Sequence, residues 1–254
     1  MTQHPARAFW WMLIAVGAIL AGCVTPRPQT VDVLAPDAAE AAYRAAIRDA
    51  ETADVGEIST QLTPITPAND ALIRRDTASE RRLLVVTWGS ATALSGAPGD
   101  TVTASDDVWI TVAPQVQNAC RTMGRTGAAL DLRLSQLLGL PPDSGYDRFY
   151  SLWVDPADLF RPCPDPEISD RECERSLPAS ERFLTVAPSH QRWFQALRQS
   201  TYGPDGYPWT RLGYTYDWHP ATDAFGLSEF VVRPGATVEI EAITPVAAYC
   251  QSDG

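Results

Sequence analysis

Carboxylates are the most abundant side chains in this sequence that could do chemistry. Hydrolysis of a glycosidic bond needs two of them at a defined separation, one to donate a proton and one to act as base or nucleophile. Sequence spacing cannot establish that separation. Asp155 and Asp158 have a simpler explanation, because an aspartate before Pro156 can cap a short helix and a second one favours its first turn. The acids considered are Asp155, Asp158, Asp165, Glu167, Asp170, Glu172, Asp217 and Glu229.

Histidine offers fewer possibilities. The segment "TYDWHP" places Asp217 and His219 at the end of a predicted strand, where His219 could transfer a proton. However, Asp217 and Trp218 point to opposite faces of a strand, and closeness in sequence is not a hydrogen bond. His190 begins a predicted helix, which favours an exposed or capping role. Asp217, His219 and Glu229 are therefore weak catalytic candidates.

Several chemistries are excluded by the residues that the sequence lacks. All 20 basic residues are arginine, so a Schiff-base lysine, a Ser-Lys dyad and a Walker-type phosphate loop cannot form. The segment "FGLSEF" resembles the Gly-x-Ser-x-Gly turn of serine hydrolases up to Ser228, but Phe230 stands where the second glycine is needed. We expect no cofactor and no metal.

Residues 201–220, "TYGPDGYPWTRLGYTYDWHP", are rich in aromatic side chains and include one arginine. Such a group could stack on sugar rings or form a patch for a partner, with Tyr207, Trp209, Arg211 and Trp218 as candidate ligand-binding residues. The alternative is structural, because aromatic residues that alternate along a strand form the buried face of a sheet. The sequence leaves both possibilities open.

The N-terminal segment has the layout of an export signal. An apolar run from Ala8 to about Leu20 follows a short positive start and is too short for a membrane-spanning helix. The residues "LAGC" resemble the lipobox of bacterial lipoproteins, which implies cleavage before Cys23 and attachment of lipid to it. Val24 in place of aspartate resembles the pattern that directs lipoproteins of Gram-negative bacteria to the outer membrane. We therefore predict a signal peptide over 1–22 and a lipid-anchored protein that faces the periplasm.

The formal charge of −11 limits the possible partners. Binding of nucleic acid needs clustered cations, and so does electrostatic binding to anionic lipid. We expect no nucleic acid partner, and we expect lipid at Cys23 to hold the protein at the membrane. Residues 23–56 are predicted to form a lipidated tether and a helical segment, and residues 57–254 one globular domain. A partner would be an envelope protein or a glycan.

Four cysteines remain once Cys23 is lipidated. An even number in an exported protein indicates disulfides, and four cysteines allow three pairings. The most economical joins Cys163 to Cys173 and leaves Cys120 to join Cys250. A zinc site is the alternative, although the cysteines lack closely spaced pairs. The loop "RPCPDPEISDREC" lacks the ligand pattern and central glycine of a calcium loop, so we expect a disulfide-closed surface loop kept solvated by its acids.

Local patterns predict the helices that must position these residues. Helices are expected within residues 35–55, 129–138 and 189–203, from alanine content, leucine spacing and terminal signals. Asp37 and Ser189 are the expected N-terminal caps.

Apolar and alternating runs predict strands at 81–89, 107–114, 147–154, 181–188, 211–218, 225–232 and 237–243. The last two are expected to be joined as an antiparallel hairpin through Pro234 and Gly235. In 211–218, four alternating side chains should share one face, namely Leu212, Tyr214, Tyr216 and Trp218. Sequential strands with few helices favour an α+β fold with a mainly antiparallel sheet over a doubly wound fold.

These features predict an envelope lipoprotein with one disulfide-stabilised α+β domain that acts as a binding or assembly factor rather than an enzyme. Two alternatives stay open. A carboxylate-dependent carbohydrate hydrolase would be favoured by a pocket that holds Asp217 or Glu229 near Trp209. A ligand-capturing lipoprotein would show a deep apolar or aromatic cleft without a perturbed acid pair.

Overall fold

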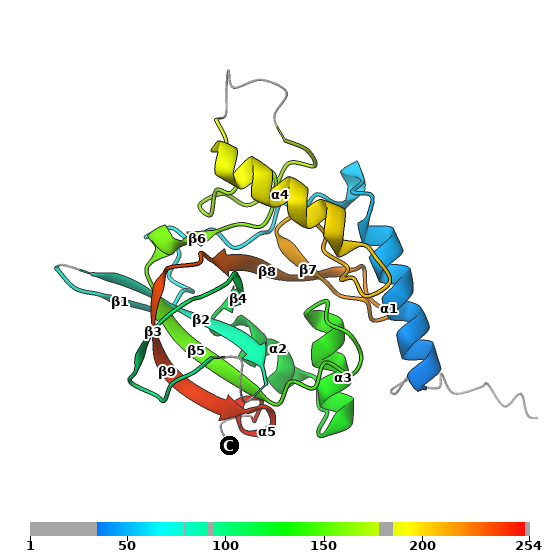
Figure 1. The fold of residues 1–254 in the computed structure, drawn as a ribbon. Coiled ribbons are helices and arrows are strands. Elements are labelled where there is room, and N and C mark those ends of the chain that lie inside the picture. Colours follow the sequence, from blue (N-terminus) through cyan, green and yellow to red (C-terminus); the bar gives the residue numbers. More distant parts are fainter. Residues whose placement is uncertain (1–34, 79, 91–93, 178–184, 252–254) are drawn as a thin grey trace, which may run out of the picture. The chain divides into compact units, whose positions relative to one another are not determined.

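The computed structural model describes residues 35–78, 80–90, 94–177 and 185–251. The helices are α1 (Pro36–Ala50), α2 (Gln115–Thr122), α3 (Ala128–Leu137), α4 (Pro188–Thr201) and α5 (Val246–Tyr249), with short 3-10 helices η1 (Val55–Glu57) and η2 (Pro156–Asp158). The strands are β1 (Arg74–Asp76), β2 (Arg81–Gly89), β3 (Thr101–Thr103), β4 (Val108–Val112), β5 (Arg148–Val154), β6 (Leu159–Phe160), β7 (Tyr214–Tyr216), β8 (Phe225–Val232) and β9 (Thr237–Pro245) (Figure 1). None of these helices is long and apolar enough to cross a bilayer. Cys23, the predicted signal peptide and the first half of the strand predicted at 181–188 lie outside the described residues.

The strands form one antiparallel sheet in the order β3-β9-β5-β2-β4-β8-β6, with β1 beside β2 and β7 beside β8. This confirms the predicted α+β class. The predicted hairpin of the last two strands is wrong, because β8 pairs with β4, β6 and β7, whereas β9 pairs with β5 and β3. The segment with Pro234 and Gly235 connects β8 to β9, but each strand pairs with partners from other parts of the sequence.

Both faces of the central strands are buried. On one face, Leu83 and Val85 of β2 pack with Leu152 of β5 in a large apolar cluster. On the other face, Val86 and Phe149 pack with residues of α2, α3 and α5. The apolar run in β2 is therefore continuous because this strand has core on both sides.

Two of the predicted helix caps are wrong and one is confirmed. Asp37 and Ser189 each lie inside the first turn of their helix, which begins one residue earlier at Pro36 or Pro188. Proline suits a first helical position, because its φ is fixed there and its missing N–H would have no partner. Asp155 does cap η2, since its side chain accepts a hydrogen bond from the backbone.

The strand predicted at 211–218 is reduced to the three residues of β7. Arg211 and Gly213 have φ values of 61° and 76°, which interrupts the extended backbone. A Cβ at Gly213 would lie 2.7 Å from Cδ of Arg161, so a larger residue would not fit without a shift. Tyr214 and Trp218 of this segment are nevertheless buried, although Trp218 lies outside the shortened strand β7.

Disulfides join Cys163 to Cys173 and Cys120 to Cys250, with Cα–Cα distances of 6.2 and 5.3 Å. This is the more economical of the predicted pairings. The first bond ties the loop between β6 and α4 to itself, and the second ties α2 to the residue after α5. The predicted disulfide-stabilised domain is therefore confirmed.

The loop closed by Cys163 and Cys173 is solvated only in part, because Glu167 and Glu172 are exposed as expected, whereas the segment 163–165 is buried. Arg161 beneath it is 0% exposed and Asp165 is also buried. The Arg161 guanidinium donates hydrogen bonds to the carbonyls of Glu167 and Asp170, both at 3.1 Å. A buried guanidinium needs several acceptors, and the loop folds inward because its backbone supplies them.

Candidate functional site

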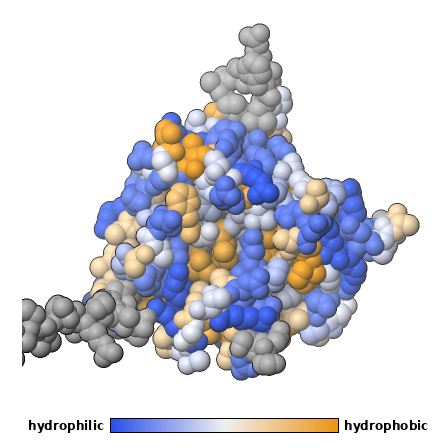
Figure 2. All heavy atoms as spheres, turned by 180° about the vertical axis from the view of Figure 1, so that it is seen from behind, coloured by the Kyte–Doolittle hydropathy of each residue, from blue (hydrophilic) through white to orange (hydrophobic). Residues whose placement is uncertain are grey.

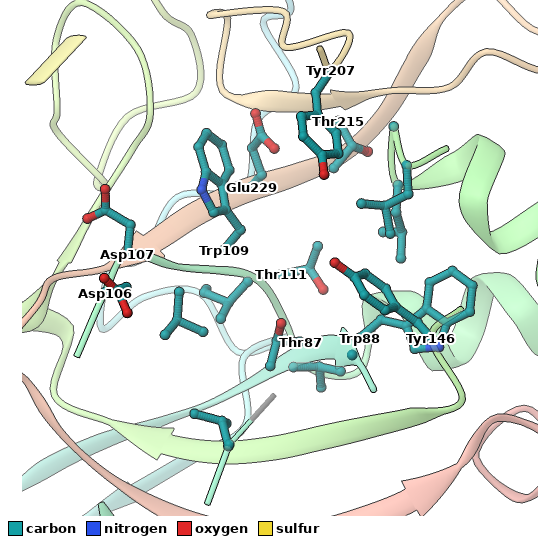
Figure 3. A pocket seen from close by; sticks show the side chains of 18 of the residues that line it. Thr87, Trp88, Asp106, Asp107, Trp109, Thr111, Tyr146, Tyr207, Thr215 and Glu229 are labelled. Carbon is teal, nitrogen blue, oxygen red and sulfur yellow. The ribbon is translucent and has the colours of Figure 1, made fainter. Parts of the chain in front are cut away.

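The sheet opens between β2 and β4. These strands pair only where Val85 and Val86 face Val112 and Thr111, although β2 continues to Gly89. Beyond that point the described part of β2 pairs with β5 alone, and β4 pairs with β8 alone. Residues on both sides of the gap line a cavity of about 790 Å³ (Figure 3).

Aromatic rings form much of the cavity wall. Trp109 of β4 meets Trp209 edge to face, with ring centroids 6.2 Å apart. Trp88 of β2 meets Tyr146 in the same manner at 5.7 Å. Tyr207 also lines the cavity and is 47% exposed, so it lies where the wall meets solvent. Walls of this kind bind apolar or planar parts of a ligand.

In Figure 3 the hydroxyl groups of Thr87, Thr111, Tyr146 and Tyr207 point toward the cavity. Burial and the nearby Tyr207 raise the pKa of Tyr146, so its phenol stays protonated at neutral pH. The buried hydroxyl of Thr111 has no hydrogen-bond partner, and neither has the indole N–H of Trp88. Buried polar groups are nearly always hydrogen-bonded in proteins, so the Thr111 hydroxyl and the Trp88 N–H are each missing one hydrogen-bond partner.

Glu229 is the most unusual group of the wall. It lies on β8 directly opposite Thr111 of β4, and its backbone N–H donates to the carbonyl of Gly213 at 3.0 Å. Glu229 is 8% exposed, and its Oε1 has no hydrogen-bond partner. Burial raises the pKa of its carboxyl group to about 8, because the charged form loses hydration and gains no cation. In this environment the group is mostly uncharged at neutral pH.

Asp106 and Asp107, in the turn between β3 and β4, are the other acids of the wall. Asp107 accepts a hydrogen bond from the indole N–H of Trp193 at 2.7 Å, and Asp106 accepts one from the Ser105 hydroxyl at 2.8 Å. The lining includes no arginine and no histidine of the described chain. Within the same residues, no ion pair reaches Glu229, Asp106 or Asp107.

Tyr207 and Trp209, two of the four residues predicted to bind a ligand, line this cavity. The Nε1 of Trp209 donates to the carbonyl of Pro162 at 3.2 Å. Trp209 also packs edge to face on Phe194 of α4, with ring centroids 5.3 Å apart. These contacts hold its ring in place beside Trp109.

Arg211 and Trp218, the other two, lie outside the cavity wall and have structural partners. Arg211 donates to the carbonyls of Ala50 and Glu51 at 3.2 and 2.8 Å, where α1 ends and its carbonyls lack helical partners. The indole N–H of Trp218 donates to the carbonyl of Leu140 at 2.9 Å. Both residues thus connect neighbouring elements to each other.

Of the three catalytic candidates, Glu229 is in the cavity wall, whereas Asp217 and His219 are not. Asp217 is 4% exposed and pairs with both terminal nitrogens of Arg133, at 2.9 and 2.5 Å. It also accepts a hydrogen bond from the His219 backbone at 3.1 Å. The Nδ1 of His219 accepts one from the backbone of Ala221 at 3.2 Å. These partners account for both residues structurally.

Three acids of the disulfide loop come together away from the cavity. Carboxylate oxygens of Asp165, Glu167 and Asp170 lie within 4.8 Å of one another, an arrangement that could hold a cation. The guanidinium of Arg161 is 3.7 Å from Asp170 and already provides a positive charge there. Burial raises the pKa of Asp170 to about 6 and lowers that of Arg161 to about 10. The expectation that no metal binds stays a prediction.

Sequence reasoning missed Trp109, Thr111, Tyr146 and the two acids at 106–107. One signal was present, because "VWITV" places a threonine inside an apolar strand, on the same side as Trp109. A buried hydroxyl needs a partner or a function. Tyr146 carries no comparable signal, since only the fold brings it to the wall.

The chain matches no protein-family model, no curated protein and no solved structure. The function is therefore inferred from the chemistry of the cavity.

Proposed function

We propose that this chain is an envelope lipoprotein that captures a small ligand in the cavity between β2 and β4. The observation that carries the proposal is Glu229, a carboxyl group buried in an aromatic cavity without a basic partner among the described residues. The volume of about 790 Å³ falls within the range of about 300–1,000 Å³ that is typical of small-molecule sites. Lipid on Cys23 would hold the cavity at the membrane surface.

The unpaired polar groups support a ligand site on energetic grounds. A buried donor or acceptor without a partner costs about 1–3 kcal/mol. Three such atoms belong to residues of the wall, namely Glu229 Oε1, Thr111 Oγ1 and Trp88 Nε1. These atoms are not accessible to a water-sized molecule, so a ligand with complementary groups would offset this cost after a small shift of the wall, and its apolar parts would pack on the rings.

Assembly with a protein partner has less support. Partner binding generally uses a contiguous exposed apolar patch. The large apolar side chains exposed within the described ranges come from separate parts of the chain, namely Val55, Ile73, Tyr207 and Phe225. On the face seen in Figure 2, hydrophilic residues separate the apolar groups. Tyr207 belongs to the cavity wall, which favours capture of a ligand.

A carbohydrate hydrolase is the second candidate, because the cavity holds Glu229 and Trp209 in one wall, as expected for that function, and Glu229 has the raised pKa that suits a general acid. It ranks second because Asp106 is exposed and Asp107 is hydrogen-bonded to Trp193. Asp106 or Asp107 in the same wall would supply the second carboxyl group. In that case the protein should release soluble fragments from envelope glycan, and Glu229→Gln should stop the release. Intact glycan after incubation would leave Glu229 with a role in binding.

Blocking the cavity tests the proposed function. Thr87 points into it (Figure 3), so Thr87→Trp should fill the space. Thr101→Trp, at an exposed position of β3, is the matched control. Protein extracted from envelopes in mild detergent would be examined by native mass spectrometry for co-purifying small molecules. We expect a bound mass in the wild type and in Thr101→Trp, and none in Thr87→Trp. Equal occupancy in all three, or none in the wild type, would contradict the proposal.

A further inference from the structure

We infer that the captured ligand carries a cationic amine, which the Glu229 carboxylate and the surrounding aromatic rings hold. This inference rests on the proposed function and adds the chemical class of the ligand. The remainder of the ligand would be apolar or planar, to match the walls of the cavity.

The first argument is charge. Glu229, Asp106 and Asp107 share one cavity wall and have no ion-pair partner in the described parts of the chain. Asp217 is similarly buried, but it is neutralised by Arg133. An acid enclosed by low-dielectric walls, as Glu229 is, attracts a cation more strongly than an acid in open solvent. Asp106 is exposed and Asp107 is half-buried, so these two add negative charge at the edge of the cavity. A ligand cation would form an ion pair with the Glu229 carboxylate, as Arg133 does with Asp217.

The second argument is the aromatic wall. The faces of tryptophan and tyrosine rings attract ammonium and guanidinium groups. The protein uses this contact with its own buried cation, since the Arg161 guanidinium lies 4.8 Å from the ring centroid of Phe230. None of the cation–ring contacts found among the described residues involves Trp88, Trp109 or Tyr146. Trp88 is buried and stacked on Phe149, so the half-buried rings of Trp109 and Tyr146 are the ones that a cation from outside would approach.

Binding of a cation should depend on pH. Among the described residues, the titratable groups around Glu229 are acids and phenols, namely Asp106, Asp107, Tyr146, Tyr202, Tyr207, Tyr214 and Tyr216. Arg211 lies over the Tyr202 ring at 5.5 Å, but its hydrogen bonds go to the end of α1. Because burial raises the pKa of Glu229 to about 8, a cation at pH 7 must bind the minor ionised form and release a proton. Affinity should therefore rise about ninefold from pH 6 to pH 7 and about fivefold from pH 7 to pH 8.

Three probes of one shape test this inference. Phenylbutylamine, phenylbutanol and phenylbutyrate are positive, neutral and negative near pH 8. Their binding to the full lipidated chain would be measured by calorimetry, with Thr87→Trp as the blank for binding outside the cavity. We expect the amine to bind at least about tenfold more tightly than the alcohol, and the butyrate to bind most weakly.

Glu229→Gln is the central variant, because glutamine has the shape of the uncharged carboxyl group. It should weaken binding of the amine about thirtyfold or more, and binding of the alcohol less than about threefold. Glu40→Gln removes one charge from an exposed pair with Arg44 on α1 and should leave both affinities unchanged. Titration in buffers with different heats of ionisation should show release of about one proton per amine at pH 7, and none per alcohol.

The outcomes separate the two proposals. If the alcohol or the butyrate binds as tightly as the amine, or if Glu229→Gln leaves binding of the amine unchanged, the cationic ligand is refuted while capture in the cavity stands. If none of the three probes binds above the Thr87→Trp blank at millimolar concentration, the cavity does not take ligands of this size and both proposals fail.

Discussion

Asp217 and Glu229 are buried to a similar degree and differ in what faces them. Asp217 faces the guanidinium of Arg133, so an ion pair satisfies it. Glu229 faces Thr111 and aromatic rings, and burial raises its pKa to about 8. Sequence cannot distinguish the two acids, because both lie in or beside short strands among aromatic residues. The contact that decides the matter joins Arg133 to Asp217 across 84 positions of the chain.

Glu229→Gln should make the stability of the protein less dependent on pH. The ordinary pKa of this carboxyl group is 4.5, and burial raises it to about 8 in the folded chain. Between these values the unfolded state ionises and the folded state does not, so the wild type loses stability as pH rises. Relative to the wild type, the variant should therefore gain on the order of 5 kcal/mol in its free energy of unfolding from about pH 4.5 to pH 8.

Urea unfolding of both proteins at several pH values would measure this difference. Glu40→Gln, which changes an exposed acid on α1, is the control and should follow the wild type at every pH. A stability difference between Glu229→Gln and wild type that stays constant with pH would show that the buried carboxyl group does not titrate as described.

At the scale of elements, the bounds of a strand can be predicted when its own side chains indicate whether it is buried. β2 has the predicted bounds, 81–89, because its apolar run suits a strand with core on both faces. The strand predicted at 211–218 is shortened by the positive φ of Arg211 and Gly213, which depends on distant contacts. The segment with Pro234 and Gly235 connects β8 to β9 without making them neighbours in the sheet.

The candidate site depends on relations between elements, so less of it could be predicted. Composition indicates Tyr207 and Trp209, and Glu229 is one of eight acids considered. Trp88 and Trp109 enter the wall because β2 and β4 stop pairing beyond the Val86–Thr111 pair. No local pattern in one sequence encodes where two distant strands separate, because that depends on the packing of both.

Removal of either disulfide should destabilise the domain. Cys120–Cys250 joins residues 130 positions apart, and Cys163–Cys173 joins residues 10 apart. The chain-entropy model gives about 5 and about 3 kcal/mol for loops of these lengths. The shorter loop also holds acceptors for the buried guanidinium of Arg161. Removal of the Cys163–Cys173 bond should therefore lower the free energy of unfolding by more than the entropic value.

Double serine variants, one for each disulfide, would be unfolded in denaturant without reducing agent. Both should have lower midpoints than the wild type, and reduction of the wild type should lower its midpoint further than either variant alone. An unchanged midpoint for the variant at 163 and 173 would show that this bond does not hold the loop around Arg161.

The whole molecule is acidic, and this property connects the proposed ligand with the proposed anchor. The formal charge is −11, and the cavity wall contains three acids without a base among the described residues. A negative field concentrates cations near the protein and opposes contact with anionic lipid headgroups. The same composition that argues against a nucleic acid partner therefore favours a cationic ligand, and it fits the proposal that lipid rather than charge anchors the protein.

Replacement of Cys23 should detach the whole molecule from the membrane. In Cys23→Ser no thiol is present to receive lipid, so the protein should remain an unacylated precursor or become a soluble product. The wild type should sediment with membranes even in high salt, because salt screens charge attraction but does not weaken burial of acyl chains. Labelling with radioactive palmitate followed by fractionation measures both effects, and Cys120→Ser, which alters a cysteine of the folded body, should remain labelled. Palmitate on Cys23→Ser would refute the anchor, and release of the wild type by salt would show that charge holds it.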